Sequence, residues 1–259
     1  MPILTLLSDF GTKDTYAGQV KGAVLAVCPS ATIVDLTHEI PPQDVRAGAY
    51  QLWAAVEVFP PGTLHLAIVD PGVGTSRRAL AVATARGDLL VGPDNGLLLP
   101  AARRLGGVAR AVELSNPRFF RKEVSRTFHG RDLFAPAAAH LLIGEPLGAM
   151  GAEAPALVED VVFPAPRTVR GALVGEVLHV DRYGNLVTNL ARAALPDRFV
   201  IRVGRARIRG APHASYQSVA PGRLLALFGS AGTLEISVRD GDAAQRLRAR
   251  VGSAVAARG

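Results

Sequence analysis

The chain has 259 residues, of which 49% are hydrophobic and 20% charged, and its formal net charge is +7. This length favours two domains, and this composition excludes a disordered chain. The positive charges are scattered, without a dense basic block interleaved with aromatic residues, so a nucleic-acid-binding role is the least favoured of the functions considered.

The chain has a single cysteine, Cys28, which excludes an internal disulfide and is typical of a reducing compartment. No apolar stretch reaches the roughly 18 to 20 residues of a membrane span, and the histidines show no metal-ligand spacing. We therefore expect a soluble, cytoplasmic protein with no membrane partner and no protein-built metal site.

Strands and helices alternate through the first part of the chain. Apolar runs predict strands at 3–7, 32–36, the first half of 64–79, 79–84, 89–92 and 108–114. Helices are predicted at 15–27, about 43–58 and about 132–142, and another helix follows the turn at 93–96 and runs to about 105. The short connection between 79–84 and 89–92 indicates an antiparallel hairpin. This order predicts a three-layer α/β domain with a mixed sheet.

The composition changes at the proline-rich segment 162–166, where we place the domain boundary. The predicted organisation is an α/β catalytic domain at 1–163, a linker at 164–170 and a smaller all-β, barrel-like domain at 171–259. Its strands are predicted at 172–180, 186–190, 199–203, 224–228 and 234–238. The alternating stretch 202–209 is interpreted as a strand with a basic solvent face, and 243–251 as a closing helix.

Polar residues in three separate loops are candidates for catalysis or binding. Asp70 follows a buried strand, and Arg77 and Arg78 lie in the loop after it, so a carboxylate and a guanidinium can share a pocket; a solvated surface pair is the alternative. His129 precedes a predicted helix, whose amino end favours neutral imidazole; a capping role is the alternative. Asp9 follows the first strand in a loop without the G-x-G-x-x-G spacing, and its carboxylate suits a ribose diol or an N-cap.

Several short motifs occur in a fixed order: Ser8–Gly11 (SDFG), Val69–Gly74 (VDPGVG), Pro93–Gly96 (PDNG), Phe128–Asp132 (FHGRD), Asp181–Asn185 (DRYGN) and Gly229-Ser230. Together they resemble the S-adenosyl-L-methionine (SAM) hydroxide adenosyltransferases. The resemblance implies attack of water or hydroxide on C5′ of SAM, giving adenosine and L-methionine. It also implies that SAM is the substrate and that no cofactor is needed.

The same resemblance implies roles for individual residues. Asp70, Arg77 and His129 would surround the attacking water, with Arg78 as a competitor for the role of Arg77. The residues implied in substrate binding are Asp9 at the ribose, Asn185 and the backbone near Val238 at adenine, Tyr183 and Tyr216 packing about the base, Asp181, Ser230 and Asp14 at the methionine group, and Asn95. Halogenating relatives have an arginine at the position of Ala231, so the group that would bind the methionine carboxylate is not assigned in this chain.

The resemblance further implies a homotrimer with sites at subunit interfaces. Two alternatives to a hydrolase remain. A SAM-dependent halogenase is disfavoured because the halogenases resembled here have tyrosine in place of Asp70, lack a counterpart of His129 and carry a long insertion at Arg86–Asp88. A catalytically inactive adenosine- or SAM-binding module is the other.

Overall fold

The computed structural model describes all residues, 1–259, and divides them into two compact units, residues 1–162 and residues 163–259. Within the segment 164–170, residues Arg167–Val169 form strand β7 of the second unit. No helix has both the length and the apolar character needed to cross a bilayer.

The first unit contains a six-stranded sheet with the order β2-β1-β3-β5-β4-β6. Its strands are β1 (Ile3–Ser8), β2 (Thr32–Thr37), β3 (Leu64–Ile68), β4 (Ala79–Thr84), β5 (Leu89–Pro93) and β6 (Val108–Glu113). β1, β2, β3 and β5 are parallel, whereas β4 is antiparallel to β5 and β6. The predicted mixed sheet and its hairpin are confirmed.

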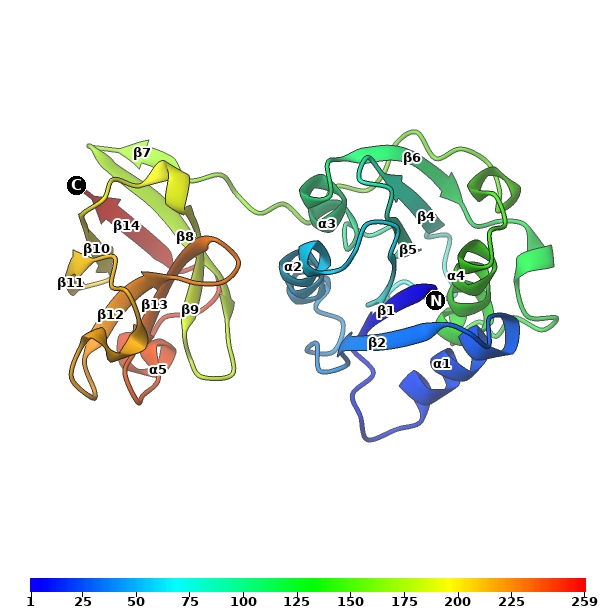
Figure 1. Cartoon of the computed structure of the whole chain (residues 1–259), viewed down its shortest axis with the longest axis horizontal. Coiled ribbons are helices and arrows are strands. Elements are labelled where there is room, and N and C mark those ends of the chain that lie inside the picture. The colour runs from blue at the N-terminus through cyan, green and yellow to red at the C-terminus, as the bar shows by residue number, and fades with distance from the viewer. The chain divides into compact units, whose positions relative to one another are not determined.

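Helices cover both faces of this sheet (Figure 1). α1 (Tyr16–Val27) and α4 (Ala135–Leu142) lie on one face, and α2 (Val45–Ala55) and α3 (Leu99–Arg104) on the other. Short 3-10 turns occur at Val56–Val58, Pro117–Phe119 and Leu147–Ala149. On the α2 face, a Cβ added at Gly48 would lie 2.9 Å from Val69 and 3.7 Å from Leu7, so glycine permits this close approach.

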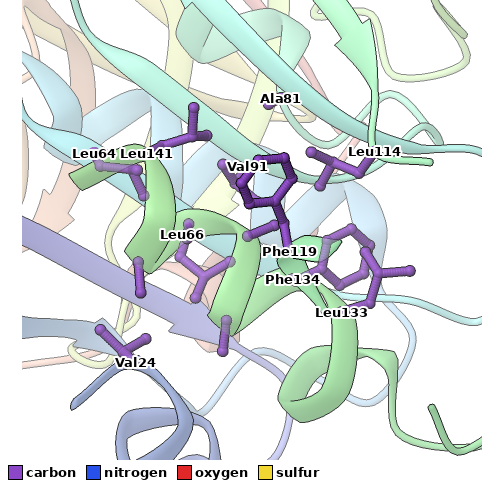
Figure 2. Packing of buried hydrophobic residues seen from close by; sticks show 14 of the residues in the cluster. Val24, Leu64, Leu66, Ala81, Val91, Leu114, Phe119, Leu133, Phe134 and Leu141 are labelled. Carbon is purple, nitrogen blue, oxygen red and sulfur yellow. The ribbon is translucent and has the colours of Figure 1, made fainter. Parts of the chain in front are cut away.

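The main core of the first unit lies between the sheet and the α1–α4 layer (Figure 2). Leu64 and Leu66 of β3 face Phe134 and Leu141, and Phe119 closes the cluster. Each such side chain, fully buried, contributes about 1.5–3 kcal/mol relative to exposure. This packing fixes β3, which ends two residues before Asp70, and Phe134, which belongs to the π-helical turn Gly130–Phe134 that follows His129.

The second unit is an antiparallel, barrel-like sheet with the order β11-β10-β14-β8-β9-β13-β12, and β7 pairs with β8. The strands are β8 (Ala172–Val180), β9 (Leu186–Ala191), β10 (Phe199–Val203), β11 (Ala206–Ala211), β12 (Leu224–Phe228), β13 (Thr233–Val238) and β14 (Ala254–Arg258). 3-10 turns occur at Arg192–Ala194 and Tyr216–Ser218. After β11, His213 N–H donates to the Ala226 carbonyl of β12 at 2.7 Å, which brings the ends of the sheet together. The predicted all-β fold is confirmed.

Two predictions for this unit are wrong in detail. The stretch 202–209 is not one strand, because Gly204 takes a positive φ of 54° and turns the chain between β10 and β11; Arg202 and Arg207 pair across this hairpin on the exposed face. The closing helix is only α5 (Ala243–Leu247), because Arg248 adopts a left-handed conformation and the chain continues into β14. That last strand was not predicted.

Candidate active site

The structure brings Asp70, Arg77 and His129 together in the first unit. Asp70 lies just beyond the buried strand β3, and Arg77 is held in the following loop. Arg77 Nε donates to Asp70 Oδ1 at 2.8 Å and Arg77 Nη2 donates to Oδ2, a two-pronged ion pair. Arg77 Nη2 also lies 3.0 Å from His129 Nδ1. Arg77 is therefore the link between the carboxylate and the imidazole.

The contact with Arg77 determines the protonation of His129. A guanidinium has only donors, so Nδ1 of His129 must accept, and the neutral ring carries its proton on Nε2. Burial lowers the pKa of His129, and the positive charge of Arg77 lowers it further. The lowered pKa favours the neutral form, and its main causes are burial and Arg77. Nε2–H is the ring group left to donate to a ligand.

Arg78 points to a different partner. Its Nε donates to Asp94 Oδ2 at 2.9 Å, and its Nη2 donates to the Ala156 carbonyl. The other oxygen of Asp94 accepts the Val158 N–H at 2.8 Å. Arg78 and Asp94 therefore hold the segment around 156–158, and of the two arginines it is Arg77 that contacts Asp70 and His129.

A cavity of about 570 Å³ opens beside this cluster. Asp70, His129 and Asp9 line it, and Asp9 Oδ2 accepts the Gln43 N–H at 2.8 Å. The apolar lining includes three mutually packed rings, Phe10, Tyr16 and Phe128, with centroids 5.3–5.9 Å apart. The size and the mixed lining suit part of a nucleoside-sized ligand.

Two predicted binding residues of this unit lie outside the cavity lining. Asn95 Nδ2 donates to the Val69 carbonyl at 2.9 Å and its Oδ1 accepts the Leu97 N–H, so its amide holds the strand end next to Asp70. Asp14 is exposed in the loop before α1. Their roles in binding stay predictions.

A second cavity, also of about 570 Å³, lies in the second unit. Five predicted binding residues line it: Asp181, Tyr183, Asn185, Tyr216 and Val238. The turn before β9 is tightly built, since Asp181 Oδ2 accepts from Asn185 Nδ2 at 2.8 Å. Asp181 Oδ1 also accepts the N–H groups of Tyr183 and Asn185, each at 2.9 Å.

Ser230 lies in an exposed turn between β12 and β13, outside this lining, and its role stays a prediction. Sequence reasoning missed the ring cluster of the first cavity and Glu235, a buried carboxylate that bonds Tyr216. An acid within the apolar run of β13 was the available signal for Glu235.

Comparison with known proteins agrees with both units. The model of the SAM hydroxide adenosyltransferase N-terminal domain matches residues 4–151, and the model of the C-terminal domain matches residues 175–256. A protein of Salinispora tropica named (R)-S-adenosyl-L-methionine hydrolase is 42% identical over 251 residues, which cover 95% of this chain and 94% of that one.

A more distant relative and a solved structure also match most of the chain. A fluorinase of an Actinoplanes species is 33% identical over 75% of this chain and 73% of its own length. A crystal structure of an uncharacterized conserved protein from Thermotoga maritima superposes with a TM-score of 0.92 at 38% identity, covering 99% of this chain and all of that one.

An α/β unit in which a carboxylate, a guanidinium and an imidazole are joined by hydrogen bonds beside a cavity, followed by a β unit with an aromatic-lined cavity, defines a two-domain enzyme that acts on a small molecule. The chain belongs to the SAM hydroxide adenosyltransferase family.

Proposed function

We propose that this protein hydrolyses SAM to adenosine and L-methionine by attack of water or hydroxide at C5′. The observation that carries the proposal is the cluster of Asp70, Arg77 and His129 beside a cavity that Asp9 also lines. The relative at 42% identity, named as a SAM hydrolase, supports it.

The chemistry suits these side chains. The oxygen of water forms a bond to C5′ while the C5′–S bond breaks, and the electron pair leaves with sulfur as the neutral thioether of methionine. No general acid is needed for that leaving group. The nucleophile must instead be oriented in line with the C–S bond and relieved of a proton.

The contacts within the cluster support the following division of catalytic roles. We assign His129 Nε2–H to donate to the water oxygen, since Nδ1 is occupied by Arg77. Asp70 then accepts the proton of the water, which passes to solvent, and Arg77 orients both partners and stabilises hydroxide character. No cofactor is required, because the sulfonium of the substrate supplies the leaving group.

The binding roles proposed for the remaining residues are those that the family resemblance implies. Asp9 is proposed to hold the ribose hydroxyls, and Asn185 with the backbone near Val238 to contact adenine. Tyr183 and Tyr216 would pack about the base. Asp181, Ser230 and Asp14 are assigned to the amino-acid end of the substrate, and Asn95 is proposed as a further binding residue.

We further propose that the enzyme works in the cytoplasm as a homotrimer, in which the first unit of one chain and the second unit of a neighbour serve the same substrate. Each unit has its own cavity with part of the predicted binding set, which supports this arrangement. Analytical ultracentrifugation should give three times the chain mass of 27.1 kDa. A monomeric enzyme with full turnover would exclude it.

Product analysis tests the activity. The purified protein is incubated with SAM in ¹⁸O-water, with and without fluoride or chloride, and the products are separated by chromatography and mass spectrometry. We expect adenosine labelled at the 5′ oxygen and L-methionine, with halide making no difference. A 5′-halogenated nucleoside would identify a halogenase, and binding without turnover would identify an inactive module.

A further inference from the structure

Glu235 is a buried carboxylate without a cationic partner. It lies on β13 with 7% of its surface exposed, while its neighbours Leu234 and Ile236 point to the opposite face, into the core of the second unit. No Lys, Arg or His forms an ion pair with it, whereas buried acids are ordinarily paired with a cation or a metal. The contacts of its carboxyl group are therefore hydrogen bonds alone.

Two hydroxyl groups supply those bonds. Tyr216 Oη donates to Glu235 Oε1 at 2.7 Å, and Ser237 Oγ donates to the same oxygen at 2.9 Å. Hydrogen bonds to an ionised acceptor are about twice as strong as neutral ones. Burial and Glu235 both raise the pKa of Tyr216, so the phenol stays a donor across the physiological range.

The ring of Tyr216 is presented to the second cavity while its hydroxyl is tied down. The residue is 46% exposed and lines the cavity together with Tyr183 and Asn185. Its short 3-10 turn is closed by other residues. The Ser215 N–H donates to Ser218 Oγ, and the Ser218 N–H donates to the Ser215 carbonyl. The turn is therefore formed without Glu235, and what Glu235 fixes is the direction of the ring.

We propose that Glu235 is a positioning residue: by accepting the Tyr216 hydroxyl, it holds that ring in the orientation in which it packs on the adenine of the substrate. The proposal rests on the proposed function. A free tyrosine ring loses rotamer freedom when a ligand packs on it, and a ring that is already anchored does not. Removing the anchor should weaken binding about 3- to 10-fold and leave the chemical step unchanged.

A double-mutant cycle tests the coupling. Tyr216→Phe keeps the ring and removes the donor, and Glu235→Leu removes the acceptor. Each is expected to raise KM for SAM, and the calorimetric Kd for adenosine, about 3- to 10-fold with kcat nearly unchanged. The double variant should be no worse than either single variant. Glu235→Gln keeps an acceptor and should recover most of the affinity.

Ser237→Ala is the matched control, because it removes the other donor to the same oxygen and should leave KM near the wild-type value. Additive effects in the cycle, or a loss confined to kcat, would overturn the proposal. Should Glu235→Leu fail to fold, Tyr216→Phe decides the matter alone: a roughly 3- to 10-fold higher KM with kcat nearly unchanged supports the proposal, and a wild-type KM overturns it. A wild-type protein that binds adenosine without cleaving SAM would refute the proposed function alone.

Discussion

Two adjacent arginines of one loop have different partners, and this divergence gives a test at the scale of single residues. Arg77 bonds both Asp70 and His129, which requires the fork of a guanidinium. In Arg77→Lys a single ammonium cannot make both contacts, so we expect kcat to fall about 10²-fold with a smaller change in KM. Steady-state kinetics with SAM provides the measurement.

Arg78→Lys is the control for this prediction. Arg78 contacts Asp94 and the Ala156 carbonyl, away from the cluster, so its replacement should lower thermal stability and leave kcat nearly unchanged. Equal losses of kcat in both variants would argue against the assignment of Arg77.

His129 makes a second residue-scale prediction, on pH dependence. Its neutral ring accepts the Arg77 N–H, and protonation abolishes that acceptor. The pKa of His129 lies below the ordinary value of 6.5, because burial and Arg77 disfavour the cation. We therefore expect log(kcat/KM) to be level above pH 6.5 and to fall as the pH drops through a midpoint below 6.5. In His129→Gln this acidic limb should vanish along with most of the activity; an unchanged limb would assign it to another group.

At the scale of elements, the turn that carries His129 depends on Asp132. Asp132 is fully buried, accepts from Arg131 Nε at 2.6 Å, and accepts the Ser125 N–H at 3.0 Å. Burial raises its pKa, but these two bonds, together with the positive charges of Arg131 and Arg121, lower it more, so the carboxylate stays ionised. The preceding loop, whose Ser125 and Thr127 line the first cavity, is thereby tied to the π-helical turn at Gly130–Phe134.

Asp132→Asn should loosen that attachment. We expect kcat to fall about tenfold or more, because sub-ångström displacement of a catalytic group is costly, together with a lower Tm. The control is Glu153→Gln, which breaks an exposed ion pair with Arg110 and should change neither quantity. Activity at the wild-type level in Asp132→Asn would show that the turn holds His129 unaided.

The elements also show what the sequence can and cannot predict. Buried parallel strands such as β3 are mainly apolar runs. The end of the run, and hence the position of Asp70 after a strand, was therefore predictable from the sequence pattern. The division between β10 and β11 was not, because the alternation of Arg and apolar residues continues across Gly204. The position of β14 was likewise hidden: it is short, alanine-rich and stabilised by pairing with β8 and β10, partners distant in sequence.

The site shows the same limit. Motifs indicated Asp70, Arg77 and His129, but only coordinates separate Arg77 from Arg78, since both directions are open to adjacent loop residues. The role of Glu235 depends on Tyr216, which is 19 residues away, and so it could not be derived from spacing.

At the scale of the whole molecule, the net charge is carried by one unit. Residues 163–259 contain 15 of the 29 basic and 6 of the 22 acidic residues, which gives the second unit +9 and the first −2. Nearly all the ion pairs described above join residues of the first unit, where acids and bases are balanced. The basic residues are thus divided almost evenly, 15 against 14, and the second unit is positive because it contains few acids. A charge of this size promotes solubility more than it indicates a partner.

Stability of the first unit at acid pH follows from a buried network that joins three strands. His65 of β3 is fully buried, its Nδ1 lies 2.8 Å from Thr5 Oγ1 of β1, and its Nε2 lies 3.9 Å from Asp88 next to β5. Burial lowers the pKa of His65 to about 4, with Asp88 opposing this shift and Arg86 adding to it. Between pH 6.5 and 4, His65 is therefore protonated in the unfolded chain and neutral in the folded chain.

The unfolding free energy of the wild type should consequently be level above pH 6.5 and fall by about 3 kcal/mol between pH 6.5 and 4 through this group. Urea denaturation at pH 7.5 and 4.5, compared with His65→Gln, measures this contribution. The variant is expected to be less stable at pH 7.5, because Thr5 Oγ1 loses its hydrogen bond with His65 Nδ1. It should lose less stability on acidification, since the glutamine amide does not titrate. The other histidines titrate equally in both proteins and cancel in the comparison, so an identical loss in wild type and variant would mean that His65 is not the buried group that resists protonation.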